Sequence, residues 1–381
     1  MRIRMYNVGY GDCFCLRDKK KNLLVDFGTS NGRIEGRPRR DIFDMVLSDL
    51  MSIENKNLLL THFHLDHLSG LLYLMKHRRG SFDFGTIYLP DVFSSPEKSR
   101  TLALLLLSDL RKDSFLPSKQ VSLYALVEAL SSRIGKTKIA FLSRGRSFEG
   151  KYTALWPDHD EIGAMTERIL VPLEKEHSWI LKSVLAFAEK LRQMICSMAE
   201  DGTGEKPYAI SALEQEFRDL RSMPEFRQLM DAVDAEDAEK WDIKNSISVV
   251  FQNSEDSEWN LLFTGDISGE YMKKIAGNYD GTLPLHEHYW CIKVPHHGTG
   301  SHYYNFADYT PENLLISNGI YHTLGKKQAK AARTTTEYAG MFHTWDVTMW
   351  CSNSSCCDGF RDGCSCKECE IISPRYYLDI R

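Results

Sequence analysis

The chain has 381 residues, of which 43% are hydrophobic and 26% are charged, with 25 glycines and 12 prolines. This composition excludes a disordered, collagen-like or repetitive chain. At about 150 residues per domain, the length allows two or three domains, or one large domain with an insertion. With 47 basic and 52 acidic side chains the net charge is −5, which as an average over the whole chain argues against a nucleic-acid substrate.

The sequence shows neither an export signal nor a membrane span. Its first residues lack the apolar stretch of a signal peptide, and the longest aliphatic run, at residues 104–107, is too short to cross a bilayer. We therefore expect a cytoplasmic protein without membrane contact. The ten cysteines then fit reduced thiols or metal ligands better than a disulfide framework.

Strands are predicted at the start of the chain. Short apolar stretches at residues 2–8, 13–16 and 23–25 are separated by Gly-containing or Lys-rich turns, which is typical of closely spaced strands. A Gly- and Arg-rich loop follows to residue 40, and apolar residues then recur at helical spacing as far as Leu50. The apolar run at 57–60 predicts a buried strand that ends directly before Thr61 and His62.

The alternation of strands and helices stops near Pro157 and resumes near Asn245. The segment between, residues 158–242, carries 20 acidic and 10 basic side chains, and its apolar residues recur at helical spacing. Beyond it, strands are predicted at residues 247–251, 261–263 and 292–294. We therefore divide the chain into a core of residues 1–157 and 243–350, an acidic helical insertion at 158–242, and a Cys-rich extension at 351–381.

Three histidines and an aspartate lie within six residues, directly after the strand predicted at 57–60: His62, His64, Asp66 and His67. So dense a set of nitrogen and carboxylate ligands is typical of a transition-metal site. In an extended loop His62 and His64 project to the same side, whereas Asp66 and His67 lie beyond the bend and can serve a second ion. A solvated His-rich loop, or a single structural metal, is the competing interpretation.

Two later strands also end in residues that bind metals. The apolar run 261–263 leads to Asp266, and the run 292–294 leads to His296 and His297. Open sheets build their sites at strand ends. Taken alone, Asp266 would be an ordinary turn or cap residue, so it is the combination of these segments that predicts a site.

Together, these segments resemble the metallo-β-lactamase superfamily. The run from His62 to His67 fits the HxHxDH signature of that superfamily, and Asp266 falls where it has a metal-bridging aspartate. Residues 7–13, 24–28, 263–266 and 293–299 are similar, in order, to the soluble hydrolase domain of ComEC-type DNA-uptake proteins and their stand-alone relatives. The resemblance covers about residues 1–157 and 243–350, and it implies an α+β fold, a four-layer αββα sandwich.

The resemblance also implies two divalent ions, Zn²⁺ or Mn²⁺, as cofactors. His62 and His64 would hold the first ion, Asp66, His67 and His297 the second, and Asp266 would bridge both. His296 would then support the ligands from behind or donate a proton to the leaving oxygen. The catalytic residues predicted in this way are Asp66, Asp266 and His296.

One departure from the superfamily pattern concerns the first ion. Many members supply a third histidine from a segment between the signature and the bridging aspartate, but here Asn245 lies near that position, as in ComEC-type relatives, and His159 is a weak substitute. A site with fewer nitrogen ligands favours Mn²⁺ or an exchangeable ion over tightly held Zn²⁺. Asn245, and His322 near the place of another histidine in relatives, are candidate substrate-binding residues.

These ligands predict hydrolysis, but they do not by themselves predict the substrate. Two ions about 3.5–4 Å apart would lower the pKa of a bridging water, hold the hydroxide for in-line attack and neutralise charge on a phosphoryl oxygen. We expect a phosphodiester substrate, DNA or RNA, mainly from the ComEC-type likeness. Without the insertion the chain carries +5, and arginines in the Gly-rich loop could clamp phosphates, although a solvated loop is the plainer interpretation. These candidate arginines are Arg37, Arg39 and Arg40.

Two other functions stay open. Small esters, thioesters and lactams are cleaved by the same chemistry, and fold alone does not choose among substrates. The alternative enzyme is therefore a hydrolase of such a small molecule. The non-enzyme alternative is a partner-regulated module in which the metal site is structural.

The insertion and the tail lie outside the resemblance. The apolar stripe of the insertion fits internal packing, a homodimer or partner contact, or a lid. In the tail, four thiolates could hold one structural zinc ion, although the spacing lacks two CxxC knuckles, and free thiols or disulfides are the alternatives. The candidate zinc ligands are Cys357, Cys364, Cys366 and Cys369.

Overall fold

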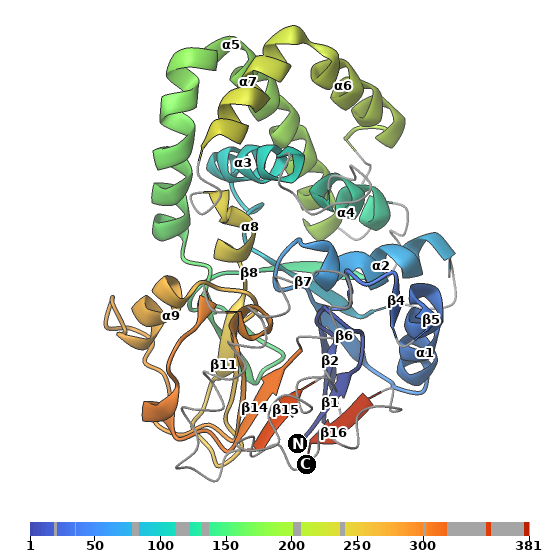
Figure 1. The fold of residues 1–381 in the computed structure, drawn as a ribbon, viewed down its shortest axis with the longest axis vertical. Coiled ribbons are helices and arrows are strands. Elements are labelled where there is room, and N and C mark those ends of the chain that lie inside the picture. Colours follow the sequence, from blue (N-terminus) through green and yellow to red (C-terminus); the bar gives the residue numbers. More distant parts are fainter. Residues whose placement is uncertain are drawn as a thin grey trace.

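Two sheets of seven strands each stack face to face, and helices cover their outer faces (Figure 1). This computed structural model describes residues 1–18, 21–34, 36–77, 84–111, 122–131, 137–200, 207–236, 241–299, 302–317, 348–351 and 377–380. The candidate residues His322, Cys357, Cys364, Cys366 and Cys369 lie outside the described residues. None of the helices in the described part is long and apolar enough to span a membrane.

The first sheet joins the two ends of the chain. Its order is β16-β1-β2-β3-β6-β7-β8, and β1 pairs with both β16 and β2 in antiparallel register. From β3 onward the strands are parallel, so their carboxyl ends lie at one edge. The strands are β1 (Arg2–Tyr6), β2 (Phe14–Arg17), β3 (Asn22–Val25), β6 (Lys56–Leu59), β7 (Thr86–Pro90), β8 (Lys138–Leu142) and β16 (Tyr377–Ile380).

The second sheet has the order β15-β14-β13-β12-β11-β10-β9. The pairs β9–β10, β10–β11 and β11–β12 are antiparallel, whereas the pairs β12–β13, β13–β14 and β14–β15 are parallel. The strands are β9 (Ser147–Phe148), β10 (Tyr152–Trp156), β11 (Val250–Asn253), β12 (Leu261–Phe263), β13 (Cys291–Lys293), β14 (Asn313–Ile316) and β15 (Thr348–Cys351). Both sheets are therefore mixed, and each has a parallel part whose strand ends can carry a site.

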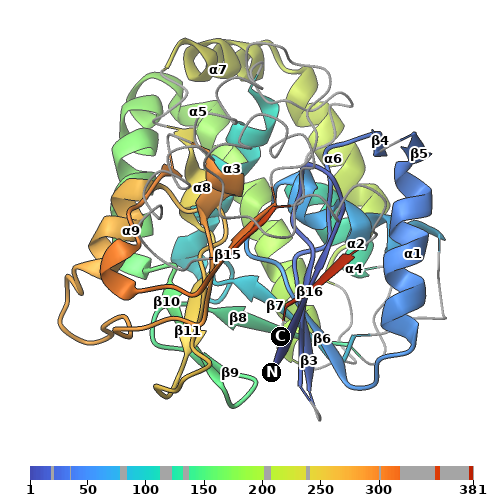
Figure 2. The same ribbon diagram turned by 60° about the horizontal axis from the view of Figure 1, so that its bottom comes forward.

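Alternating side chains divide the core into layers. Leu23, Val25 and Leu59 point between the sheets, whereas Leu24 and Leu58 face the helices. This alternation is the two-residue period of a strand buried on both faces, which explains the continuous apolar runs in the sequence. The architecture predicted from the sequence, with two stacked sheets between layers of helices, is confirmed (Figure 2).

Helices close both outer faces of the sandwich (Figure 2). The long apolar side of α1 is buried from Ile42 to Leu50, and α9 packs by Met272 and Ile275. A short two-stranded ribbon, β4 with β5, precedes α1. The elements are β4 (Arg33–Ile34), β5 (Arg37–Pro38), α1 (Arg39–Met51), α2 (Leu65–His77), α3 (Ser99–Leu110), α4 (Ser122–Ser131) and α9 (Gly269–Ala276).

The acidic segment 158–242 forms helices that pack on α3 and α4 and rise above the sandwich (Figure 1). These helices are α5 (His159–Glu200), with a break in helical geometry at His177, α6 (Ile210–Ser222) and α7 (Pro224–Ala235), and they are followed by α8 (Ile243–Ser246). The apolar stripe of α5 is buried within the chain: Ile180, Val184, Phe187, Leu191 and Ile195. A buried ion pair of 2.8 Å between Lys244 Nζ and Asp109 Oδ1 ties α8 to α3.

Candidate metal centre

The candidate ligands collect at strand ends of both sheets. His62 and His64 lie in the loop after β6, and Asp66 and His67 form the first turn of α2. Asp266 follows β12, and His296 and His297 follow β13. The parallel parts of the two sheets thus bring together segments about 200 residues apart in the sequence.

The backbone around the signature is packed too closely for larger residues. Phe27 N donates to His67 O at 2.7 Å, and Asp12 N donates to Asp66 O at 3.0 Å. A Cβ atom on Gly28 would lie 2.5 Å from the backbone of Asp66 and of His67. Glycine at position 28 therefore allows the loop after β3 to hold the start of α2 in place.

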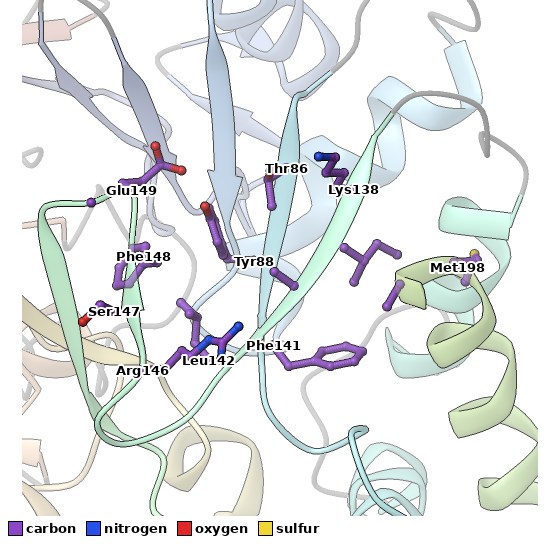
Figure 3. A pocket seen from close by; sticks show the side chains of 14 residues that line it. Thr86, Tyr88, Lys138, Phe141, Leu142, Arg146, Ser147, Phe148, Glu149 and Met198 are labelled. Carbon is purple, nitrogen blue, oxygen red and sulfur yellow. The ribbon is translucent and has the colours of Figure 1, made fainter. Parts of the chain in front are cut away.

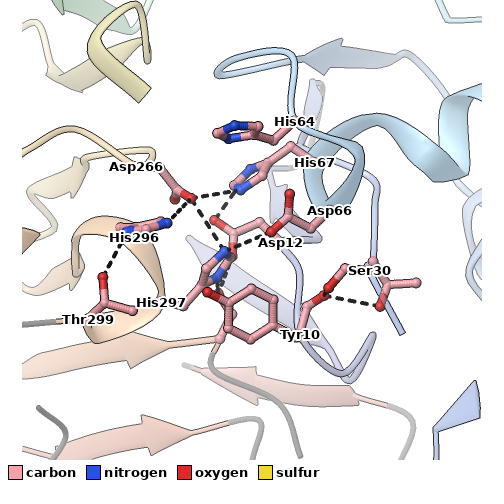
Figure 4. A network of polar contacts seen from close by, with 12 residues as sticks. Tyr10, Asp12, Ser30, His64, Asp66, His67, Asp266, His296, His297 and Thr299 are labelled. Atoms are coloured by element: carbon pink, nitrogen blue, oxygen red, sulfur yellow. Dashed lines mark hydrogen bonds and ion pairs between the residues drawn. The ribbon is translucent and has the colours of Figure 1, made fainter. Parts of the chain in front are cut away.

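One oxygen of Asp266 is the point on which the histidines converge (Figure 4). Its Oδ2 lies 3.1 Å from His67 Nε2, 3.3 Å from His297 Nε2 and 3.9 Å from His62 Nε2. His296 Nε2 lies 3.8 Å from the same atom. A carboxylate oxygen surrounded by imidazole nitrogens is the arrangement that a bridging ligand requires.

The cluster separates into two overlapping ligand sets. Asp66 Oδ2 and His297 Nε2 are 3.3 Å apart, and with His67 they form one close group. His62 joins His67 and Asp266 in another close group, and His64 Nδ1 lies 2.9 Å from His62 Nε2. The structure therefore brings together all six metal ligands predicted from the sequence.

Each of three ligand histidines is oriented by a polar group behind it. Asp26 Oδ2 lies 2.8 Å from His67 Nδ1, and Thr61 Oγ1 lies 3.1 Å from His62 Nδ1. Asp12 Oδ1 lies 3.2 Å from His297 Nδ1. Such partners set the tautomer of an imidazole and leave its other nitrogen for an ion.

A buried lysine joins the two carboxylates of this network. Lys293 Nζ lies 2.6 Å from Asp12 Oδ2 and 3.1 Å from Asp266 Oδ1, and it donates to Gly265 O at 2.7 Å. The lysine engages one oxygen of Asp266, so the other oxygen is turned toward the histidines. These opposing charges raise the pKa of Lys293 although burial alone would lower it.

The electrostatics of the cluster favour cations. Burial would lower the pKa of His67, but the charges of Asp266 and Asp26 outweigh it and hold that pKa well above its usual value. For His297, burial is likewise outweighed by Asp266 and Asp12, and the pKa rises to about 9. The carboxylates thus attract positive charge to this point, and a divalent ion would displace the protons that they hold there.

For the two histidines predicted to hold the first ion, burial outweighs the nearby charges. Burial is the main cause that lowers the pKa of His64 to about 4, and it also holds the pKa of His62 well below its usual value. Asp66, predicted for the second ion, shows the opposite outcome, because the close approach of His297 at 3.3 Å and the charges of the nearby imidazoles outweigh burial and lower its pKa to about 2. Neutral imidazoles and an ionised carboxylate are the forms that bind metals.

The residues present fit divalent transition-metal ions. His297 Nε2 is a buried nitrogen without a hydrogen-bond partner, although carboxylate oxygens of Asp66 and Asp266 surround it. A buried polar atom of this kind calls for a partner such as an ion. The donor set of imidazole nitrogens and carboxylate oxygens suits Zn²⁺ or Mn²⁺.

The other predicted residues lie around this centre. Asn245, in α8, is buried; its Nδ2 lies 3.5 Å from His302 Nε2, and its Oδ1 has no hydrogen-bond partner in the described part of the chain. Arg37 lies in β5, and Arg39 and Arg40 are exposed at the start of α1, where Arg40 pairs with Asp41. His159 pairs with Asp91 at 3.4 Å and takes no part in the cluster.

Sequence reasoning assigned no role to several polar residues that complete the site. Asp26 ends a strand as Asp266 does, and Lys293 interrupts an otherwise apolar strand, so both carried a recognisable signal. Asp12 follows Gly11 in a turn, and His302 stands in a loop six residues after His296. Asp12 falls in the run 7–13 that resembles ComEC-type proteins, whereas His302 carried no signal apart from residue type. The four residues are Asp12, Asp26, Lys293 and His302.

A separate hollow of about 670 Å³ opens beside β7, β8 and β9 (Figure 3). Tyr88, Lys138, Arg146 and Phe148 line it, together with Met198 of α5. No member of the His/Asp cluster lines this hollow. The hollow is therefore distinct from the candidate metal centre.

Two stacked sheets with a buried His/Asp cluster at their strand ends are the arrangement expected of a metallo-β-lactamase-like fold with a metal centre. Residues 6–80, which include the whole HxHxDH signature, match the sequence model of the metallo-beta-lactamase superfamily. Among solved structures, the metallo-beta-lactamase fold protein YhfI from Bacillus subtilis matches with 12% identity and a TM-score of 0.37, over 92% of this chain and 96% of that chain. No curated protein matches the chain.

Proposed function

We propose that this protein is a two-metal phosphodiesterase or nuclease that acts on DNA or RNA. The observation that carries the proposal is the position of Asp266, whose Oδ2 lies within 3.9 Å of imidazole nitrogens from both ligand sets. A single carboxylate shared by two ions is typical of centres that clamp both oxygens of an in-line displacement.

The residues divide the work between the two ions. His62 and His64 would hold the first, Asp66, His67 and His297 the second, and Asp266 would bind both. When bound, such ions lower the pKa of water and neutralise charge on a phosphoryl oxygen. The buried network behind the ligands keeps their orientation constant during the reaction.

A path of contacts leads from the centre to the arginine-bearing loop. The ring of Tyr10 lies 4.4 Å from that of His297 (Figure 4). Tyr10 O accepts from Ser30 N at 2.9 Å, and Gly32 O accepts from Arg39 N at 3.0 Å. Arg39 and Arg40 are exposed at the start of the helix that follows this loop, and arginine side chains bind phosphate groups well.

Charge distribution also supports a phosphodiester. The acidic segment 158–242 carries 10 more acidic than basic groups, whereas the remaining chain carries a net +5. The net charge of −5 for the whole chain is therefore the sum of an acidic helical segment and a basic remainder. Basic surface near a metal centre attracts phosphate backbones at low and moderate salt.

Purified protein loaded with Mn²⁺ or Zn²⁺ tests the proposal against single-stranded DNA, duplex DNA, RNA and a small phosphodiester. We expect cleavage that chelation abolishes and that Asp66→Ala reduces strongly. Arg39→Glu with Arg40→Glu should raise the KM for oligonucleotides without changing hydrolysis of the small phosphodiester. Arg218→Glu with Arg227→Glu, at exposed positions of α6 and α7, is the matched charge control.

Two results would contradict the proposal. One is the absence of metal-dependent cleavage of every phosphodiester, with Asp66→Ala indistinguishable from the parent protein. The other is metal-dependent hydrolysis of a small ester, thioester or lactam alone, which would favour the alternative enzyme.

A further inference from the structure

His296 has the same two-sided geometry as the ligand histidines. Its Nε2 lies 3.8 Å from Asp266 Oδ2, and this distance is close to the 3.9 Å of His62 Nε2 (Figure 4). Its Nδ1 lies 2.7 Å from Thr299 Oγ1 and 2.8 Å from His302 Nδ1. Metal-bound imidazoles direct one nitrogen at the ion and bind a polar partner with the other. His296 satisfies both conditions.

The backbone directs His296 and His297 toward the same carboxylate. Both residues have left-handed conformations, with φ of 45° and 56°. Such conformations are unfavourable for residues other than glycine, and they persist only where the surroundings impose them. His296 N donates to Gly265 O at 3.2 Å, which fixes this turn against the residue preceding Asp266.

A chain of polar groups supports His296 from behind. His302 lies between His296 and Asp242, with its Nε2 3.2 Å from Asp242 Oδ2. Asp242 is the last residue of the acidic segment 158–242, and Asn245 Nδ2 lies 3.5 Å from the same His302 nitrogen. Asn245 thus contacts the residue that supports His296.

We propose that His296 is the third histidine ligand of the first ion, together with His62, His64 and Asp266. The proposal rests on the two-ion function described above. Tetrahedral coordination with bonds of about 2.0–2.1 Å separates donor atoms by roughly 3.3 Å. The observed separations are 2.9 Å between His62 and His64, 3.9 Å between His62 and Asp266, and 3.8 Å between His296 and Asp266. These three separations lie within about 0.6 Å of that value.

This assignment replaces the role of proton donor predicted for His296 from the sequence. An imidazole nitrogen that binds an ion has no proton to give to a leaving oxygen. The two roles therefore exclude each other, and they differ in what removal of the imidazole does to metal binding.

Metal content separates the two roles. The parent protein, His296→Asn and the control His288→Gln are saturated with Zn²⁺, gel-filtered, and analysed by inductively coupled plasma mass spectrometry. We expect His296→Asn to hold one ion fewer per chain than the parent and the control. Ions held by cysteines cancel in this difference. An unchanged ion count with lost activity would overturn the ligand role and favour a proton donor.

The same measurement distinguishes failure of the proposed function. If Asp266→Asn removes no more than one ion from the parent protein, the two-ion centre and the ligand role of His296 both fail. If Asp266→Asn removes two ions while His296→Asn removes none, only the ligand role fails.

Two further variants decide the matter if His296→Asn does not fold. His302→Gln and Thr299→Val leave the imidazole of His296 in place and weaken its support. Loss of such a partner lowers metal affinity by roughly 10- to 100-fold, so a chelator competition should show a weaker first ion and an unchanged second ion. First-ion affinities equal to that of the parent in both variants would overturn the proposal.

Discussion

The two sides of the metal centre use similar ligands but different supports. On the second-ion side, carboxylates lie behind His67 and His297, at 2.8 Å and 3.2 Å. On the first-ion side, the neutral hydroxyl of Thr61 lies behind His62 at 3.1 Å. A carboxylate partner raises the basicity of a ligand imidazole more than a hydroxyl does. We therefore expect a tightly held second ion and an exchangeable first ion.

Distances to the shared carboxylate follow the same division. Asp266 Oδ2 lies 3.1 Å from His67 and 3.3 Å from His297 on the second-ion side, but 3.9 Å from His62 on the first. The histidines that have carboxylates behind them therefore also lie closer to Asp266 than His62 does. Side chains behind the ligands can therefore give the two ions of one centre different affinities.

The largest effect is expected from Asp266→Asn, which removes the ligand that both sides share. Loss of several kcal/mol of transition-state stabilisation corresponds to a fall in kcat of roughly 10³-fold. Both ions should leave, as measured by metal analysis beside steady-state kinetics. Retention of one ion would contradict a two-ion centre that is built on Asp266.

Lys293→Met tests the charged network in the absence of metal. Removal of the lysine leaves Asp12 and Asp266 buried without their partner, so the metal-free protein should lose about 3–5 kcal/mol of unfolding free energy in urea. Arg4→Met breaks another largely buried ion pair, with Asp49 at 2.9 Å, and serves as the matched control. The control should lose stability but keep both ions, whereas Lys293→Met should also weaken the second ion. Equal metal affinity in the two variants would contradict a special role of Lys293.

Removal of metal should lower stability in two steps. An ion that binds only the folded protein stabilises it by about 2.7 kcal/mol when its free concentration is 100 times its Kd. Titration with a chelator of graded strength, followed by thermal unfolding, should therefore release the first ion at lower chelator concentration than the second. A single step that removes both ions together would contradict the inequality of the two sides.

The smallest effects compare the supports directly. Asp26→Asn, behind His67, should weaken the second ion by roughly 10- to 100-fold. Thr61→Val, behind His62, should weaken the first ion by less, because a hydroxyl polarises the imidazole less than a carboxylate. Chelator competition on each variant measures both affinities. Equal losses would show that the type of support does not matter.

Sequence patterns predicted much of the fold because burial leaves regular traces. Strands at residues 2–8, 13–16, 23–25, 57–60 and 261–263 were all found, with ends shifted by no more than two residues. The strand expected at 247–251 begins later, at Val250, because residues 243–246 form the helix α8. A short apolar run does not by itself distinguish a strand from a helical turn.

The sequence by itself determined the fold class and the ligands that share one loop. His62, His64, Asp66 and His67 lie within six residues, so local geometry alone holds them near one point, and Asp266 and His297 follow strands that are recognisable from their apolar runs. Only the tertiary structure decided what stands behind these ligands. Asp12, Asp26, Lys293 and His302 come from separate loops and strands, and pairing between distant parts of both sheets brings them to the centre. Such contacts leave no periodic trace in a sequence, because a single buried polar residue looks the same whether it caps a turn or orients a ligand.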